Sequence, residues 1–253
     1  MSSKKEYNLT QLNPETTFER HVFHRDQFAH YLRWTHVLKK AKIGQKILDY
    51  GSGSGNLAEV LYRNRFKCQQ YCGLEFRSKT VDQANLKFEN VAWIEFYQKD
   101  IIKDDLTEFG NDWDIIVSFE VAEHVGKNNI DKYLHNASKM MNENTIFMLS
   151  TPNYDEKVGA AANHIFDSQD GRGKVSQEFY HQELEEKIKK YFVITEKYGT
   201  FASQTHYKNI MNDWQKNMFE ELNKYYDTNL LSVIMAPFFP EQARNCLWVL
   251  KAL

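Results

Sequence analysis

The sequence predicts an α/β protein with a doubly wound, mostly parallel sheet of seven strands, in a single domain over residues 1–253. Short apolar runs alternate with amphipathic helical segments, which is typical of parallel strands joined by crossover helices. The first apolar run, 46–50, enters a glycine-rich turn, as strands do at the ligand-binding edge of such sheets. The length also suffices for a substantial buried core.

The first half of the chain supplies a helical segment and three strands. Aromatic and aliphatic residues recur at helical spacing over 18–40, so we expect one or two helices that pack on the domain edge or cover a site. Apolar runs bounded by turn residues predict strands at 46–50, 70–75 and 92–97. Inward-facing apolar residues predict helices after the first two strands, at 56–65 and 78–86.

The second half completes the sheet. The run 114–119 is apolar enough to be a central strand of a parallel sheet. In 128–141 apolar residues recur at i, i+3, i+4, i+7 and i+11, which predicts a helix, and 145–150 is the next strand. We expect a further helix at 183–190 and the closing strands at 192–196 and 246–251.

Two stretches interrupt this alternation. Residues 154–181 are polar and contain several glycines, and they leave the carboxyl end of the 145–150 strand, where such sheets bind ligands. Residues 207–240 are inserted before the last strand, and apolar residues are spaced along one side of an expected helix that ends near 226. We expect both stretches to form loops or lids over a ligand cavity.

Composition narrows the classes of protein. No run approaches 18 apolar residues and the N-terminus lacks the apolar core of a secretory signal, so we expect no membrane association. Three cysteines, an odd and low number, suit a reducing compartment, and we expect a cytoplasmic protein. The net charge of −2 indicates no general attraction to nucleic acid, although it leaves room for a local basic face. Nothing in the pattern indicates an oligomeric state.

The glycine turn fits two kinds of nucleotide. Residues 53–58, Gly-Ser-Gly-Asn-Leu-Ala, satisfy the G-x-G-x-x-G/A pattern of dinucleotide sites. Residues 49–55, Asp-Tyr-Gly-Ser-Gly-Ser-Gly, carry the acid and the glycines of an S-adenosylmethionine (SAM) site. A carboxylate at Asp49 complements the ammonium and sulfonium of SAM but opposes a pyrophosphate. Glu75, which ends the second expected strand, can accept hydrogen bonds from both hydroxyls of a ribose.

The joint spacing of these motifs resembles the class I SAM-dependent methyltransferases and implies their Rossmann-like fold. After Asp49 and the glycines come Glu75 behind strand two and Asp100 behind strand three. Residues 118–125, Ser-Phe-Glu-Val-Ala-Glu-His-Val, follow strand four, and 150–153, Ser-Thr-Pro-Asn, follow strand five. The Glu-Val-x-Glu-His-Val string is similar to the ubiquinone-biosynthesis-type branch, whose members mostly methylate small molecules.

The resemblance implies SAM as the cofactor and a role for each motif. The glycine loop would lie along the methionine portion of SAM, Glu75 would hold the ribose diol, and Phe76 would pack on the adenine. Asp100 would accept from the adenine amino group. Phe76 can equally be a core residue, and Asp100 a helix cap. The expected cofactor residues are Asp49, Gly51, Ser52, Gly53, Gly55, Glu75, Phe76, Asp100, Ile101 and Phe119.

Candidate bases lie where the resemblance implies the acceptor pocket. A hydroxyl acceptor needs a base, whereas an amine needs little more than desolvation in its neutral form. The expected catalytic residues are Glu120, Glu123, His124 and His181, with His164 as a further candidate. Each can also be structural, as a packing or helix-start residue. His21 and His24 could share a helical face, but no acid or cysteine completes a ligand set, so we expect no metal.

We therefore expect a methyltransferase that acts on an oxygen or nitrogen of a small-molecule acceptor. The chain lacks Asp/Asn-Pro-Pro-Tyr/Phe after the fourth strand and has no Pro-Cys pair, which argues against two classes of DNA methyltransferase. The alternatives are a methyltransferase acting on nucleic acid, a nucleotide or protein, and a SAM-binding regulatory protein without turnover. A dehydrogenase is the weakest alternative.

Overall fold

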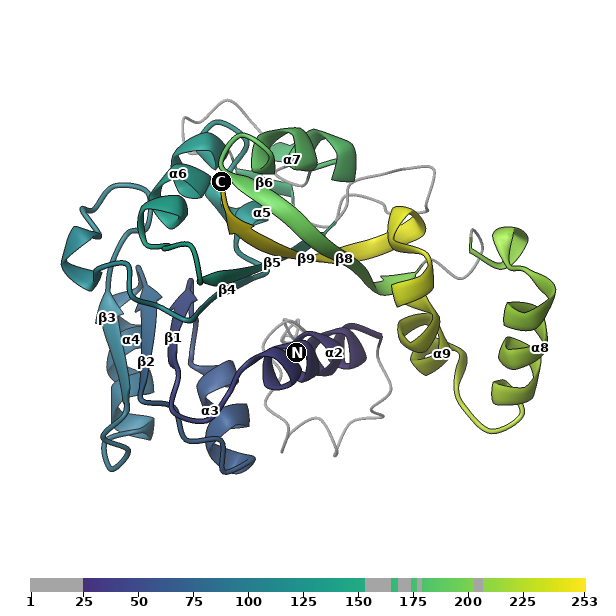
Figure 1. Cartoon of the computed structure of the whole chain (residues 1–253), viewed down its shortest axis with the longest axis horizontal. Helices are drawn as coiled ribbons and strands as arrows, with labels where there is room; N and C mark the ends of the chain where they lie inside the picture. The colour runs from purple at the N-terminus through teal and green to yellow at the C-terminus, as the bar shows by residue number, and fades with distance from the viewer. Residues whose placement is uncertain (1–24, 153–164, 168–173, 177–178, 203–206) are drawn as a thin grey trace, which may run out of the picture.

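One mixed sheet of seven strands organises the chain, in the order β3-β2-β1-β4-β5-β9-β8 (Figure 1). The computed structural model describes residues 25–152, 165–167, 174–176, 179–202 and 207–253. The strands are β1 (Lys46–Tyr50), β2 (Gln70–Glu75), β3 (Ile94–Gln98), β4 (Ile115–Phe119), β5 (Ile146–Pro152), β8 (Phe192–Ala202) and β9 (Ala243–Ala252). Strands β1 to β5 pair in parallel, and β9 runs antiparallel to both β5 and β8. The predicted α/β fold is confirmed.

The winding direction reverses at β1, and this reversal positions the site. From β1 the chain passes outward to β2 and β3, then returns to place β4 on the other side of β1. Asp49 on β1 is in register with Gly73 on β2 and Val117 on β4. The carboxyl ends of these parallel strands therefore meet at one edge, at the switch point where such sheets bind ligands.

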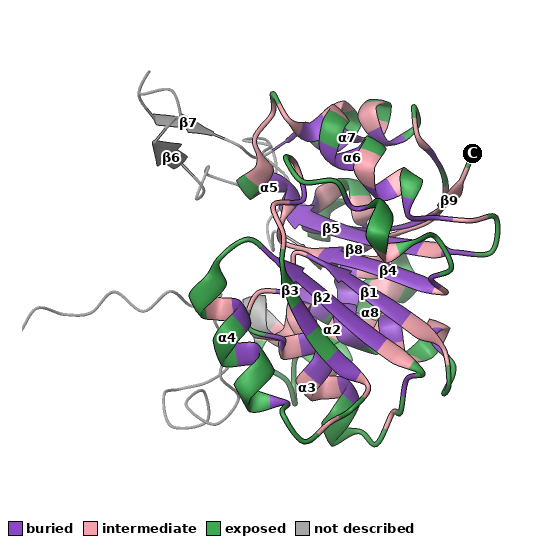
Figure 2. Ribbon diagram, turned by 90° about the vertical axis from the view of Figure 1, so that its left-hand side faces the viewer, coloured by how far each residue is buried: buried purple, intermediate pink, exposed green. Residues whose placement is uncertain are grey.

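Side chains point alternately to the two faces of the sheet along each strand, and they fill a hydrophobic core on each face. On β1, Leu48 and Tyr50 belong to the core under α6 and α7, whereas Ile47 belongs to the core under α2, α3 and α4. Figures 1 and 2 show these two groups of helices on opposite faces. The helices are α2 (Arg25–Lys40), α3 (Asn56–Arg63), α4 (Ser78–Lys87), α5 (Ala122–Val125), α6 (Ile130–Lys139), α7 (His181–Ile188), α8 (Asp213–Leu222) and α9 (Thr228–Met235).

The two last strands are longer than their apolar runs predict. Strand β8 extends to Ala202 and β9 begins at Ala243, because the two pair as a long antiparallel ladder that tolerates polar residues. Gly199 lies in this extension, and a Cβ there would come within 2.3 Å of the Ala236 carbonyl oxygen. The close approach of the segment η4 (Ala236–Phe238) to β8 therefore requires a glycine.

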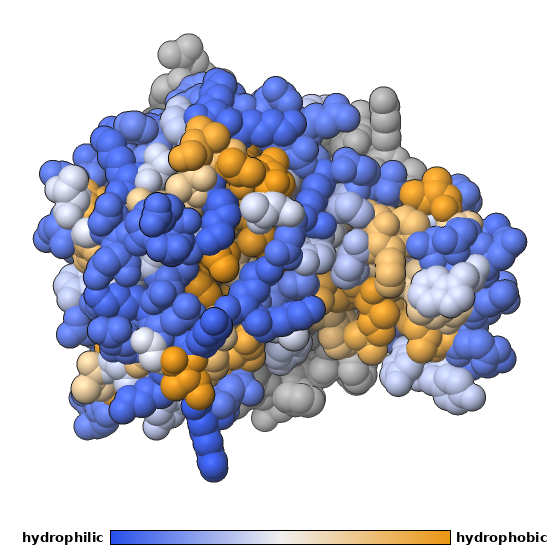
Figure 3. Space-filling view, viewed as in Figure 1, coloured by the Kyte–Doolittle hydropathy of each residue, from blue (hydrophilic) through white to orange (hydrophobic). Residues whose placement is uncertain are grey.

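The insertion between β8 and β9 differs from the single helix expected up to residue 226. A short η3 turn (Lys208–Ile210) precedes α8, which begins at a capping box formed by Asn212 and Gln215. Trp214 is 62% exposed and so does not share a buried face with Phe219, which is 9% exposed. Hydrophobic side chains gather at the surface of this part of the molecule (Figure 3). Helix α9 then packs on α2 through Val233 and Ala29.

Of the long polar stretch 154–181, the structure describes a two-stranded antiparallel pair, β6 (Ile165–Asp167) with β7 (Lys174–Ser176), and the residues from 179 onward. His164 lies outside the described residues, as do His21, His24 and the start of the expected helical segment at 18. Of the helices within the described ranges, none has the length and apolar character needed to cross a bilayer.

Candidate functional site

The glycine turn after β1 is pinned to β2 and packed against the segment that follows β4. The amides of Gly51 and Ser52 both donate to the Leu74 carbonyl oxygen, at 3.0 and 2.9 Å. Gly51 has φ +100°, and a Cβ on it would lie 2.5 Å from Cγ2 of Val121. Gly53 also has positive φ, +53°, but its Cβ direction is open to 4 Å. The turn thus has one packed face and one open face.

The end of the turn leaves no room for a side chain at its last glycine. Gly55 caps the start of α3 with φ +78°, and a Cβ there would lie 2.6 Å from Cζ of Phe96. The Ser52 hydroxyl is buried and has no hydrogen-bond partner among the described residues. A bare backbone turn with an open glycine and an unsatisfied hydroxyl suits a polar ligand such as the methionine portion of SAM, so the residues fit this cofactor.

Asp49 is a buried acid at the base of this turn. Its side chain accepts a hydrogen bond from the Tyr71 hydroxyl. Burial raises the pKa of Asp49 to about 7; the Tyr71 hydrogen bond opposes this rise, and the negative charge of Glu75 adds to it. Two interacting acids, Asp49 and Glu75, thus lie at the ends of β1 and β2, and a cationic ligand there would favour the ionised form of Asp49.

Glu75 ends β2 with a nearly buried carboxylate. Its Oε1 accepts from the Arg77 amide at 3.1 Å and from Arg77 Nε at 2.7 Å. Phe76 is 63% exposed, so its alternative reading as a core residue is wrong. The Arg77 guanidinium carbon lies 5.6 Å from the centre of the Phe76 ring. An acid and an exposed aromatic ring thus stand side by side at the predicted cofactor edge.

Asp100 organises the turn after β3. Its Oδ1 accepts from the amides of Ile102 and Lys103, at 3.0 and 3.2 Å, and Lys103 Nζ lies 3.2 Å from Oδ2. Although partial burial opposes the change, these amides and the Lys103 ammonium lower the pKa of Asp100. Asp100 therefore caps a turn, and the expected helix cap is wrong because no helix begins directly after it; its proposed bond to adenine stays a prediction.

Ile101 and Phe119 occupy less polar positions. The Ile101 carbonyl oxygen accepts from the Tyr50 hydroxyl at 3.1 Å and from Asn136 Nδ2 at 2.9 Å, which fixes the turn on the sheet. Phe119 ends β4 in register with Ser150 on β5 and is half-buried. Both positions adjoin the carboxyl edge, and a contact of either residue with SAM stays a prediction.

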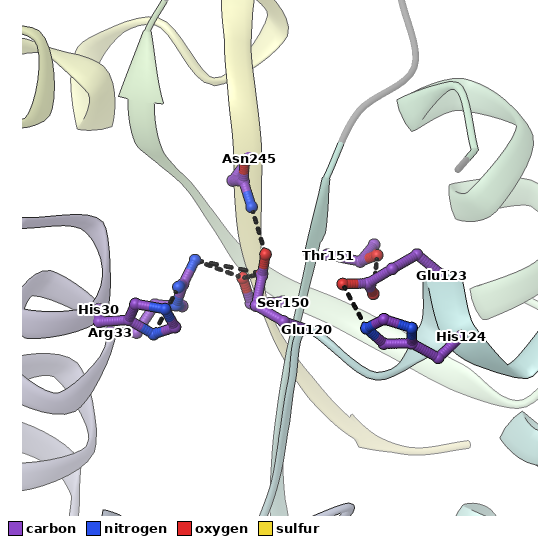
Figure 4. Close-up of polar contacts among 8 residues, drawn as sticks. All are labelled: His30, Arg33, Glu120, Glu123, His124, Ser150, Thr151 and Asn245. Carbon is purple, nitrogen blue, oxygen red and sulfur yellow. Dashed lines mark hydrogen bonds and ion pairs between the residues drawn. The ribbon is translucent and has the colours of Figure 1, made fainter. Parts of the chain in front are cut away.

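A charged network lies where β4, β5 and β9 meet α2 (Figure 4). Arg33 Nη1 lies 3.2 Å from Glu120 Oε1, Asn245 Nδ2 donates to Oε2 at 2.8 Å, and Ser150 Oγ donates to Oε1 at 3.1 Å. Arg33 is 1% exposed. Glu120 has φ +58°, a conformation uncommon for a side chain of its size. The network anchors the Glu120 carboxylate, so it supports a binding role better than a mobile base.

Sequence reasoning missed Arg33 and Asn245. Arg33 does carry a signal, because it stands four residues after Ala29 and four before Val37, both buried, in the inward stripe of α2. A charged residue within an apolar stripe indicates a buried partner. Asn245 carries no such signal, since its position at the site depends on where the antiparallel β9 enters the sheet.

Glu123 and His124 form a second polar pair on α5 (Figure 4). The Glu123 side chain is fully buried, and Thr151 Oγ1 donates to its Oε2 at 2.8 Å. His124 Nε2 lies 3.9 Å from Glu123 Oε1, and the His124 side chain is 51% exposed. At this distance the carboxylate makes no hydrogen bond to the ring, but its charge can stabilise the protonated imidazole that general-base catalysis forms.

His181 has a packing environment that differs from the one expected of a base. Its ring meets Trp248 edge-on at 5.3 Å, and Cys246 Sγ lies 3.6 Å from Nδ1. Burial, and secondarily the charges of Lys197 and Arg244, lower the pKa of His181 to about 3. An imidazole so hard to protonate is a weak base, which favours its structural role. Among the described residues, no group of three His, Cys, Asp or Glu side chains is arranged to hold a metal ion.

Comparison with known proteins decides the family. A family model described as a methyltransferase domain matches residues 23–215. The chain belongs to this methyltransferase family. No curated protein sequence matches the methyltransferase significantly.

Several solved structures are similar to the methyltransferase along most of its length. A SAM-dependent methyltransferase from Mesorhizobium loti has a TM-score of 0.59 at 15% identity, over 90% of this chain and 99% of that one. A TehB-like SAM-dependent methyltransferase from Corynebacterium glutamicum has 0.57 at 13% identity, over 87% of each chain. Haemonchus contortus phosphoethanolamine N-methyltransferase 2, in complex with SAM, has 0.55 at 15% identity, over 88% of this chain and 52% of that one.

The TM-scores show that the chain shares the fold of these structures. Together with the family match, they confirm the predicted class I SAM-dependent methyltransferase, an enzyme whose cofactor is SAM.

Proposed function

We propose that this methyltransferase transfers the methyl group of SAM to an oxygen or nitrogen of a small-molecule acceptor, with His124 as the base when the acceptor is a hydroxyl. The observation that carries this proposal is the Glu123–His124 pair. Glu123 is buried and fixed by Thr151, and it lies behind a half-exposed imidazole. In this arrangement His124 takes the acceptor proton, and Glu123 stabilises the imidazolium that results.

The proposed cofactor site lies along the carboxyl edge of the sheet. When bound, SAM supplies an electrophilic methyl group on a sulfonium centre. Asp49 and the open face of the glycine turn would hold its methionine portion, Glu75 the ribose hydroxyls and Phe76 the adenine face. Support comes from the position of the two interacting acids, Asp49 and Glu75, and from the exposed Phe76 ring. Asp100, Ile101 and Phe119 would complete the adenine side.

The proposed acceptor site lies beside the 120–124 segment. Val121 packs on Gly51, so the segment that carries Glu120 and His124 adjoins the glycine turn. The charged groups that reach this region include the carboxylates of Glu120 and Glu123, and the nearby Arg33 is buried in its ion pair. A neutral or cationic small molecule suits such a site better than a phosphate backbone. The Glu120–Val125 string supports membership of the ubiquinone-biosynthesis-type branch.

Tritium transfer from methyl-labelled SAM tests the proposal. The enzyme is offered panels of phenols, alcohols and amines, and in parallel RNA, DNA and protein fractions. We expect label in small molecules; label confined to a macromolecular fraction would contradict the acceptor class.

A second experiment tests the base. With a hydroxyl acceptor, His124→Gln should lower turnover by about 10²–10⁴-fold, while calorimetry shows unchanged SAM binding. His135→Gln, on the exposed side of α6, is the matched control. Full activity of His124→Gln would rule out His124 as the base.

A further inference from the structure

Arg77 occupies a position that its residue type does not suit locally. It is the N-cap of α4 and makes no side-chain capping hydrogen bond. Ser, Thr, Asp and Asn are preferred there because they accept hydrogen bonds from the first helical amides, which a guanidinium cannot do. A cation at this end also opposes the helix dipole. The helix therefore does not explain the arginine.

The contacts of Arg77 are with residues of the proposed cofactor site. Its Nε donates to Glu75 Oε1 at 2.7 Å, and its guanidinium lies over the Phe76 ring at 5.6 Å. The Glu75 side chain is 6% exposed, whereas that of Arg77 is 48% exposed. The arginine side chain thus covers the carboxylate from the solvent side, while its own surroundings leave it room to move away.

The ion pair between Arg77 and Glu75 also affects the electrostatics of the neighbouring acids. Glu75 adds to the rise in pKa that burial imposes on Asp49, so the two acids repel each other across the ends of β1 and β2. Arg77 supplies a positive charge directly on Glu75. A cationic ligand that also donates hydrogen bonds to Glu75 can supply both effects, and the arginine then becomes dispensable.

We propose that Arg77 competes with the ribose hydroxyls of SAM for the Glu75 carboxylate and thereby lowers the affinity of the enzyme for its cofactor and for the product S-adenosylhomocysteine. The inference rests on the proposed role of Glu75 in ribose binding. One oxygen, Oε1, accepts both hydrogen bonds from Arg77. Both lone pairs of Oε1 are taken by Arg77, so a ribose diol that binds one hydroxyl to each carboxylate oxygen displaces the arginine side chain, while the Arg77 amide can stay in place. The ion pair thus sets how readily the nucleoside enters and leaves.

Calorimetric titration of the full chain with SAM and with S-adenosylhomocysteine tests the competition. Arg77→Met should bind both nucleosides about three- to tenfold more tightly, because a half-exposed ion pair no longer has to be broken. The matched control is Lys79→Met, which removes an exposed cation from the first turn of the same helix. Its affinities should equal those of the wild type. Tighter binding cannot result from damage to the fold, whereas unchanged or weaker binding by Arg77→Met overturns the proposal.

A double-mutant cycle with Glu75→Gln separates the two levels of inference. Glu75→Gln should weaken binding, and adding Arg77→Met to it should change affinity less than twofold, since the competitor then has no carboxylate to occupy. If Glu75→Gln binds as well as the wild type, Glu75 does not hold the ribose and both proposals lose their basis. If Glu75→Gln weakens binding and Arg77→Met alone does not tighten it, only the competition is wrong. A gain from Arg77→Met that persists in the Glu75→Gln background also overturns the competition.

Discussion

The Arg33 guanidinium on α2 lies 3.2 Å from the carboxylate of Glu120, which follows β4 and is 87 residues away along the chain. The two side chains are 2% and 20% exposed. This ion pair joins α2 to the proposed acceptor region, in addition to the role of α2 as a cover for one face of the sheet.

Removing the arginine should destabilise the fold. In Arg33→Met the Glu120 carboxylate loses its counter-charge in a mostly buried position, and we expect the free energy of unfolding to fall by about 2–4 kcal/mol. Urea denaturation measures this change. Arg33→Met combined with Glu120→Gln should recover part of the loss, because no buried charge is then left alone.

Lys46 provides the control for this prediction. Its ammonium pairs with Asp112, whose side chain is 67% exposed, so Lys46→Met should cost less than about 1 kcal/mol. If Arg33→Met costs no more than Lys46→Met, the Arg33–Glu120 pair is not a stabilising contact.

Two glycines of the same turn should respond differently to alanine. Gly51→Ala places a Cβ 2.5 Å from Val121 at φ +100°, and should cost about 2–4 kcal/mol of stability. Gly53→Ala, at φ +53° with an open Cβ direction, should cost about 1 kcal/mol but weaken SAM binding by about tenfold. Denaturation and calorimetry measure the two quantities. Wild-type affinity in folded Gly53→Ala would show that SAM does not occupy the open face.

Asp49 should make the protein less stable as pH rises. Its pKa in the folded state is about 7, above its ordinary value of 3.8, so the folded protein holds a proton that the unfolded chain releases. The contribution of Asp49 to the free energy of unfolding is fully present below about pH 4, and it is lost progressively as the pH rises to about 7. Relative to Asp49→Asn, the wild type should lose roughly 2–4 kcal/mol across that window in urea denaturation. If the free energies of unfolding of the two proteins change in parallel with pH, the pKa of Asp49 is not raised in the folded protein.

His181 should have the opposite dependence. Its folded pKa of about 3 lies below its ordinary 6.5, so acid protonates the unfolded chain first. The stability is fully present above pH 6.5 and is lost as the pH falls toward 3. Between pH 6.5 and 4, the wild type should lose about 2–3 kcal/mol relative to His181→Leu. With a hydroxyl acceptor at neutral pH, His181→Leu should retain turnover; a loss on the scale of His124→Gln would restore His181 as a catalytic candidate.

Local patterns were sufficient for the sheet and for the cofactor edge. The glycine turn is recognisable because positive φ at Gly51 and Gly53 requires a residue without a Cβ, and Glu75 because an acid ends an apolar run. These features depend on neighbours within a few residues. Their positions at one edge then follow from parallel pairing.

The proposed acceptor region depends on distant partners, and the sequence pattern could not identify them. Glu120 receives a hydrogen bond from Asn245, 125 residues away, through the register of an antiparallel strand. His181 begins a helix and resembles a candidate base, but its burial depends on Trp248 from β9. The apolar spacing around residue 214 predicts one buried face, but Trp214 lies on the exposed side of the helix that forms there. In each case long-range packing decides what the side chain does.

Helix α2 is continuous from Arg25 to Lys40, and two of its consecutive turns have different partners. Ala29 packs on Val233 of α9, and Arg33, one turn later, holds Glu120. One helix thus joins the insertion between β8 and β9 to the edge of the sheet that carries Glu120, so the insertion and the Glu120 carboxylate share a single rigid support.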